Sequence, residues 1–191
     1  MTKDDIITLP HPSLHKRSQR VHVMTTETQQ LIDDMRAAAL DWEASRPHEV
    51  AVALAAVQID RLERVVIVRA DFDNKNNKEF IALINPEVVK AEGEQVTEHE
   101  GCLSVGHRLY GLVPRYEKIR AKALDEQGRE VRVKVDGFMA RVLQHEIDHT
   151  NGICFVDHIK NNHNAFFQLT DKGELEPVSY DYAIKTGIFR D

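Results

Sequence analysis

The chain has 191 residues, of which 42% are hydrophobic and 29% charged, and its formal net charge is −6. This balance is typical of a globular protein with one hydrophobic core and excludes a disordered chain. The negative charge argues against nucleic-acid binding by bulk electrostatics, and two cysteines are too few for a disulfide framework. No stretch approaches the roughly 20 apolar residues that cross a membrane. The start of the chain does not have the pattern of a signal peptide, so we expect a cytoplasmic protein.

The first half of the chain predicts one helix followed by short strands. Thr25 or Thr26 is a candidate N-cap for an amphipathic helix over 26–45. Its apolar residues recur at spacings of three and four: Leu31, Ile32, Met35, Ala38, Ala39 and Trp42. The elements expected next are an apolar run at 50–57, a buried strand at 64–69, a polar hairpin-like loop at 71–78, and a returning strand at 80–85 that Pro86 stops.

The second half predicts more strands and then a late helix. Further strands are expected at 87–91, 96–98, 117–124 and 130–136, with a turn at 125–128 between the last two. A second helix over 137–149 ends at Asn151-Gly152. From about residue 161 the tail is polar and is expected to be irregular, with one turn at 171–173. Strands before a late helix predict one α+β domain over residues 1–191.

The second predicted helix carries His145-Glu146-x-x-His149. Positions i and i+4 lie on one face of a helix, so both imidazoles can reach one metal ion. Glu146 can reach a water beside the metal, whose pKa the ion lowers, and can take and return its proton.

A catalytic metal site needs a third protein ligand. The long metalloprotease pattern is excluded, because it requires histidine where this chain has Phe155. Several other ligands stay open for a zincin-type peptidase, namely His158, Asp157, Glu174 and Glu176. Cys102, which follows a glycine, is a natural soft ligand for Zn²⁺ or Fe²⁺.

Three motifs together resemble the peptide deformylases. Glu-Gly-Cys-Leu-Ser is intact at 100–104, and Gln-His-Glu-x-Asp-His is intact at 144–149. The family's Gly-x-Gly-Leu-Ala-Ala-x-Gln stands at 51–58 with alanine at both glycine positions. The order and spacing of the motifs also match, and the resemblance covers roughly residues 6–160.

The resemblance implies a fold of antiparallel sheets packed around a central helix that carries the histidine motif. It implies that Cys102, His145 and His149 bind one divalent metal ion, with Fe²⁺ expected in the cell and Zn²⁺ or Ni²⁺ able to replace it. Glu146 is then the general acid/base. The Gln58 side-chain amide and the Leu103 backbone N–H are the donors to the oxyanion.

The resemblance also implies the substrate, the formyl group on the N-terminal formylmethionine of new polypeptides in a bacterial cytoplasm. The residues expected to contact the peptide are Val52, Ala53, Gly101, Phe138 and Val142, the last two against the methionine side chain. Two roles are considered for residues 161–191: a transient contact with the ribosome, or covering the hydrophobic core. No direct nucleic-acid specificity and no membrane contact are expected.

Supporting residues are also predicted near the metal ligands. Glu100 is expected to pair with Arg115, as the equivalent family positions do, and Asp148 is a candidate to orient a ligand histidine through its second ring nitrogen.

Ala51 and Ala53 depart from the family pattern. Each adds a methyl group beside the expected path of the peptide, and a positive φ at Ala53 would cost on the order of 1 kcal/mol. We therefore expect an intact hydrolytic site with an altered peptide groove, and reduced activity or a changed substrate range. Two alternatives remain at this stage, a zincin-type metallopeptidase and a non-catalytic deformylase-like binding module.

Overall fold

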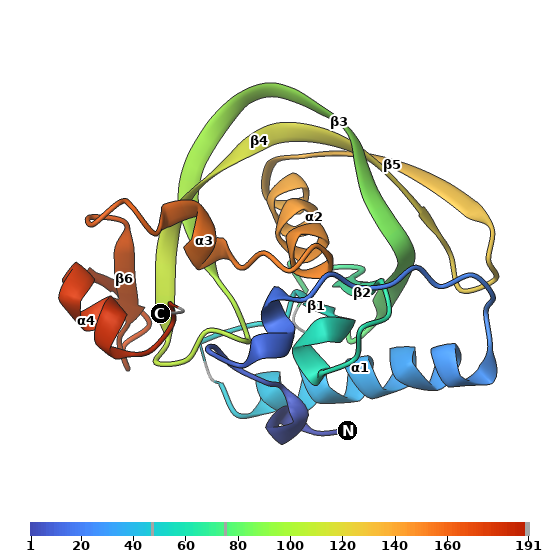
Figure 1. The fold of residues 1–191 in the computed structure, drawn as a ribbon, viewed down its shortest axis with the longest axis horizontal. Coiled ribbons are helices and arrows are strands. Elements are labelled where there is room, and N and C mark those ends of the chain that lie inside the picture. Colours follow the sequence, from blue (N-terminus) through green and yellow to red (C-terminus); the bar gives the residue numbers. More distant parts are fainter. Residues whose placement is uncertain (47, 75, 190–191) are drawn as a thin grey trace.

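The computed structural model describes residues 1–46, 48–74 and 76–189. Over these residues, seven strands form one sheet in which every strand pair is antiparallel (Figure 1). The strand order is β1-β2-β3-β4-β6-β7, and β5 also pairs with β4. The strands are β1 (Ala53–Ala55), β2 (Val65–Arg69), β3 (Phe80–Gly101), β4 (Leu109–Leu124), β5 (Glu130–Asp136), β6 (Phe166–Leu169) and β7 (Leu175–Pro177). The helices are α1 (Thr26–Ala44), α2 (Gly137–Thr150), α3 (Phe155–Ile159) and α4 (Tyr180–Lys185), with short 3₁₀ helices η1 (Lys3–Asp5), η2 (Pro12–His15) and η3 (Ala56–Ile59).

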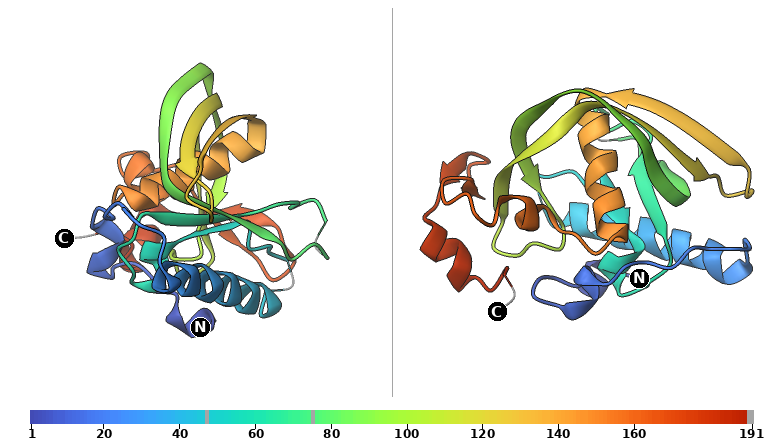
Figure 2. Two further views of the ribbon diagram at one scale, coloured as in Figure 1. Left: turned by 90° about the vertical axis from the view of Figure 1, so that its right-hand side faces the viewer. Right: turned by 45° about the horizontal axis from the view of Figure 1, so that its top comes forward.

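Helices α1 and α2 cover opposite faces of β1 and β2, as the left view of Figure 2 shows. Alternate residues of β2 divide between two apolar clusters: Val65 and Ile67 pack with α1, whereas Val66 and Val68 pack with α2. This alternation follows from the two-residue period of a strand. The expected α+β class and the expected helix at 26–45 are thus confirmed, and the Thr25 hydroxyl accepts a hydrogen bond from Thr28 N (3.2 Å) as the N-cap.

The strand that was expected to stop at Pro86 continues as β3 to Gly101. The pairing of β3 with β4 shifts register between Ile84 and Glu87, so the proline lies in a bulge, where a ladder N–H is not needed. Asn85 has a positive φ of 54° there, and its side chain exchanges hydrogen bonds with the Val21 backbone (2.9 and 2.7 Å). The prediction of a stop was wrong because the bulge is stabilised by a residue far away in the sequence. Residue 75 of the predicted 71–78 loop lies outside the described residues.

Helix α2 begins and ends where the sequence predicts, to within one residue. Gly152 follows it with φ +79°, and a Cβ there would meet His15 O at 2.6 Å. The asparagine-glycine stop is therefore fixed both by backbone conformation and by close packing. In Figure 1, β3 and β4 arch over α2, which places the histidine motif inside the curve of the sheet.

The expected irregular tail is instead ordered as β6, β7 and α4. Phe166, Ala183 and Ile188 are buried in a third apolar cluster with α3, and β6 pairs with β4. The prediction was wrong because these few apolar residues are widely spaced and gain their partners from other parts of the chain. Within the described residues, no helix has the length and apolar character needed to cross a membrane.

Candidate active site

Cys102, His145 and His149 meet at the end of β3 and on the inner face of α2. Cys102 Sγ lies 3.1 Å from His149 Nε2, which lies 3.2 Å from His145 Nε2. The ligand atoms of all three residues are within 4.8 Å of one another. The structure thus brings together the Cys-His-His set that the resemblance implies, from segments more than 40 residues apart.

The donor set fits a borderline-soft divalent cation such as Fe²⁺, Zn²⁺ or Ni²⁺. Burial, together with the charge of His145, lowers the pKa of His149 well below its ordinary value, which favours the neutral imidazole that metals bind. Glu146 Oε2 is buried without a hydrogen-bond partner among the described residues. A buried carboxylate oxygen without a partner costs free energy, and it is what a water held beside a cation would satisfy.

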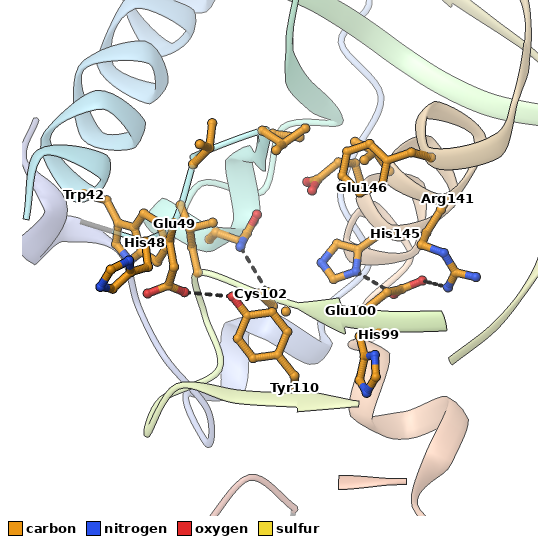
Figure 3. Close-up of a pocket in the computed structure, with 18 residues that line it drawn as sticks. Trp42, His48, Glu49, His99, Glu100, Cys102, Tyr110, Arg141, His145 and Glu146 are labelled. Atoms are coloured by element: carbon orange, nitrogen blue, oxygen red, sulfur yellow. Dashed lines mark hydrogen bonds and ion pairs between the residues drawn. The ribbon is translucent and has the colours of Figure 1, made fainter. Parts of the chain in front are cut away.

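Glu100 orients His145. Its Oε2 lies 3.0 Å from His145 Nδ1, and its two oxygens accept hydrogen bonds from Arg115 (2.9 and 3.1 Å). Arg141 donates to the same carboxylate (2.7 Å) (Figure 3). Although burial opposes ionisation, the contacts with His145 and Arg115 hold the pKa of Glu100 well below its usual range. The predicted Glu100–Arg115 pair is confirmed, and the same carboxylate fixes His145 with Nε2 toward the other ligands.

The sequence made Asp148 a candidate to orient a ligand histidine, but in the structure its carboxylate has other partners. Its carboxylate accepts a hydrogen bond from Arg115 and lies 2.7 Å from His158 Nε2. His158 is therefore engaged with Asp148 and Arg115, not with the histidine pair. Asp148 and His145 are three residues apart on α2, but the Asp148 carboxylate is bound by Arg115 on β4. Glu100, from another strand, takes the orienting position.

Glu146 is 4% exposed, follows His145 on α2 and lines the same pocket as Cys102 and His145. Burial raises its pKa to about 7, with the Glu100 carboxylate acting in the same direction. A carboxyl group with a pKa near the working pH can both accept and donate a proton.

Gln58 is held rigidly by both ends of its side-chain amide. Its Oε1 accepts the Ala55 N–H (2.8 Å), and its Nε2 donates to Ser104 Oγ (3.1 Å). The same Nε2 lies 3.5 Å from Cys102 Sγ. The amide donor therefore faces the candidate metal site, and this orientation is fixed before any substrate binds.

A pocket of about 290 Å³ opens beside these groups. All the residues expected to contact the peptide line it, together with Leu103: Val52, Ala53, Gly101, Phe138 and Val142. Phe138 is 46% exposed, so it is a rim residue of the pocket.

No local sequence pattern identifies several further lining residues, namely Trp42, His48, Glu49, His99 and Tyr110. Tyr110 Oη donates to Glu49 Oε2 (2.9 Å) (Figure 3), and burial, with the nearby Glu49 carboxylate, raises the pKa of Tyr110. These two residues are 61 positions apart, so no local pattern relates them.

Ala51 and Ala53 occupy different environments. Neither has a positive φ, so the strain considered for Ala53 is absent. Ala53 lines the pocket, whereas Ala51 is fully buried and its backbone is bound by Glu43 (3.1 Å) and Arg69 (3.2 Å). Of the two departures from the family pattern, only the one at residue 53 faces the pocket.

A sequence model of the family described as "Polypeptide deformylase" matches residues 3–165. The chain belongs to the peptide deformylase family. This result confirms the family and the enzyme class, a metal-dependent hydrolase of formyl groups, that the three motifs predict. Among deformylases of known sequence, that of Thermomicrobium roseum is 44% identical over 159 residues, which cover 82% of this chain and 85% of that protein. The one from Macrococcus caseolyticus is 37% identical over 167 residues, covering 83% and 91%.

Solved deformylase structures share the fold. The deformylase of Legionella pneumophila has a TM-score of 0.69 and 38% identity, covering 80% of this chain and 83% of that one. The deformylase of Synechococcus elongatus in complex with actinonin has a TM-score of 0.72 and 29% identity, covering 82% and 79%. The mixed helix and antiparallel-sheet architecture is therefore that of the peptide deformylases.

Proposed function

We propose that the protein hydrolyses the formyl group from N-terminal formylmethionine, with one divalent metal ion held by Cys102, His145 and His149. The observation that carries this proposal is the convergence of these three ligand groups at the edge of a pocket that the buried Glu146 also lines. We expect Fe²⁺ in the cell, with Zn²⁺ or Ni²⁺ as possible replacements.

A divalent cation bound there supplies Lewis acidity and lowers the pKa of water at the site. Glu146 removes a proton from the attacking water and returns it to the departing α-amino nitrogen as the formyl C–N bond breaks. Formate and a free amino terminus are the products. Burial raises the pKa of Glu146, which favours its uptake of the proton from water.

Gln58 and Leu103 act on the charge that develops on the formyl oxygen. We assign the donors to Gln58 Nε2 and the Leu103 backbone N–H, each worth about 3 kcal/mol of transition-state stabilisation. The hydrogen bonds of Gln58 to Ala55 and Ser104 support this role, because they fix the amide before the reaction begins.

We assign the methionine side chain to the space between Phe138 and Val142, and the peptide backbone to the side of Val52, Ala53 and Gly101. We further propose that residues 1–191 act as one domain in a bacterial cytoplasm, on N-formylmethionyl peptides emerging from the ribosome, with at most a transient ribosome contact. The net charge of −6 supports the absence of direct nucleic-acid specificity, and we propose no membrane contact.

Formate release tests this proposal. The protein is purified anaerobically, its metal content is measured, and formyl-Met-Ala-Ser is the substrate. Glu146→Gln keeps the size of the side chain but cannot take a proton, so kcat is expected to fall by about 10²–10⁴-fold while the metal is retained. An unchanged kcat in this variant would refute the role of Glu146.

A further inference from the structure

The candidate pocket is bounded on one side by a wall that joins two separate segments of the chain. Tyr110, on β4, reaches across to Glu49, which precedes β1. Figure 3 shows the two side chains pointing toward one another, with His145 and Glu146 beyond Cys102 in that view. The wall therefore lies apart from His145 and Glu146 on α2.

The Tyr110 ring is held in place on both sides. A Cβ at Gly101, its direct partner in the β3–β4 pairing, would come within 2.5 Å of the ring, so the ring packs directly over the glycine backbone. The hydroxyl binds Glu49 at 2.9 Å, and the Glu49 side chain is only 10% exposed. Glu49 is bound in turn by Arg46 (3.0 Å), whose guanidinium lies over the Trp42 ring at 4.7 Å. A side chain fixed in this way presents a rigid surface to a ligand.

Strand β6 supports the same wall from behind. Phe167 is the pairing partner of Tyr110, and its ring meets the pocket residue His99 edge-on at 4.5 Å. Gly173, in the turn after β6, lies beside His48, another lining residue. A Cβ at Gly173 would come within 3.3 Å of the His48 ring. Phe167 and Gly173 come after residue 165, where the match to the family's sequence model ends. The C-terminal segment is thus part of the pocket's surroundings.

The space inside the wall is limited. A pocket of about 290 Å³ lies just below the roughly 300–1,000 Å³ that ligand sites usually offer. It suits a formylmethionyl group and leaves little room for a large neighbouring side chain.

We propose that Tyr110, fixed by Glu49 and paired in the sheet with Phe167, is a specificity-determining residue that restricts the second residue of the substrate to small side chains. This inference rests on the proposed deformylase activity. The side chain of alanine or serine after formylmethionine fits beside the Tyr110 ring, whereas a large aromatic side chain at that position clashes with it.

The test compares kcat/KM for formyl-Met-Ala-Ser and formyl-Met-Trp-Ser. We expect the wild-type protein to favour the alanine peptide by at least about tenfold, because a difference of one methylene in a pocket already discriminates by about 10–200-fold. Tyr110→Ala should reduce this preference to less than threefold, mainly through a lower KM for the tryptophan peptide. Tyr110→Phe keeps the ring but loses the Glu49 bond, and Phe167→Ala loses the support from β6, so both should give intermediate ratios.

Tyr116→Ala is the matched control, since Tyr116 is on the same strand, is 40% exposed and does not line the pocket. Its peptide preference should equal that of the wild-type protein. Equal kcat/KM for the two peptides in the wild-type protein, or a preference unchanged in a folded Tyr110→Ala variant, would overturn the inference while leaving the proposed activity standing. No formate release from either peptide by the metal-loaded wild-type protein would overturn the proposed function, and the inference with it.

Discussion

Among the residues that the structure describes, two groups of His, Cys and acidic side chains bring their ligand atoms within 4.8 Å of one another, and of these only the first has the surroundings of a catalytic centre. The first is Cys102, His145 and His149, and the second is His15, Cys154 and Asp157. In the second group the carboxylate already has a structural task, because Asp157 Oδ2 accepts the Cys154 N–H (2.7 Å) at the start of α3. His15 Nδ1 lies 3.3 Å from Gly152 O.

The first group differs in what lies next to it. Glu146 Oε2 is buried without a partner among the described residues, Glu100 orients His145, and the pocket opens beside Cys102. None of the three residues of the second group is among those lining that pocket. Proximity of ligand atoms is therefore not enough: a catalytic centre also needs an oriented ligand, an uncommitted carboxylate and open space for the substrate.

Replacing each cysteine separately gives the largest expected difference between the two groups. Cys102→Ala should lower the affinity for Fe²⁺ or Zn²⁺ by more than about a hundredfold, beyond the loss that substitutions around the ligands usually cause. Cys154→Ala should leave both the tightly bound metal and the formate release in place. Metal analysis and isothermal titration of the two purified variants measure this. Metal retention in Cys102→Ala would instead favour a zincin-type site with another third ligand.

The second-largest expected effect concerns Glu100, the carboxylate that orients His145 in the first group. Glu100→Gln removes the buried carboxylate that Arg115 and Arg141 share and leaves them only Asp148 and Glu98, so the unfolding free energy should fall by about 3 kcal/mol, as for other broken buried pairs. Metal affinity should also fall by about 10–100-fold because His145 loses its oriented tautomer.

Glu98→Gln is the matched control for this change. Glu98 also pairs with Arg141 (3.2 Å), but its side chain is 58% exposed. Such an exposed pair contributes at most about 1 kcal/mol, and the metal affinity should not change. Urea unfolding and metal titration compare the two variants. Equal effects in both would mean that Glu100 acts only through general charge balance.

The parts of the site that the sequence predicts are those whose residues lie in one short segment. His145 and His149 share one helix face by spacing alone, and Cys102 comes from a motif that the family resemblance identifies. The helix bounds are predictable for the same reason, because the caps and the apolar period are local signals.

What could not be predicted depends on pairs that are far apart in sequence. The Tyr110–Glu49 bond, the β4–β6 pairing and the Asn85–Val21 contact that stabilises the β3 bulge join segments separated by about 60 residues. Each is decided by the tertiary arrangement, which local propensity does not encode. The orienting role given to Asp148 fails in the same way, because Arg115 arrives from another strand.

The smallest expected effects distinguish Ala51 from Ala53. Since neither alanine has a positive φ, restoring glycine relieves no backbone strain at either position. Ala53→Gly removes a methyl group from the pocket wall, so kcat/KM for formyl-Met-Ala-Ser should rise, but by less than tenfold, because one methyl group is worth about 1 kcal/mol.

Ala51→Gly should not raise kcat/KM, since this methyl group is fully buried with the α1 cluster and does not line the pocket. It should instead lower the unfolding free energy by about 1 kcal/mol, through greater freedom of the unfolded chain and lost packing. Steady-state formate release and urea unfolding of both single variants and of the double variant separate the two effects. A gain in kcat/KM from Ala51→Gly alone would show that the peptide path extends further along this segment than the pocket does.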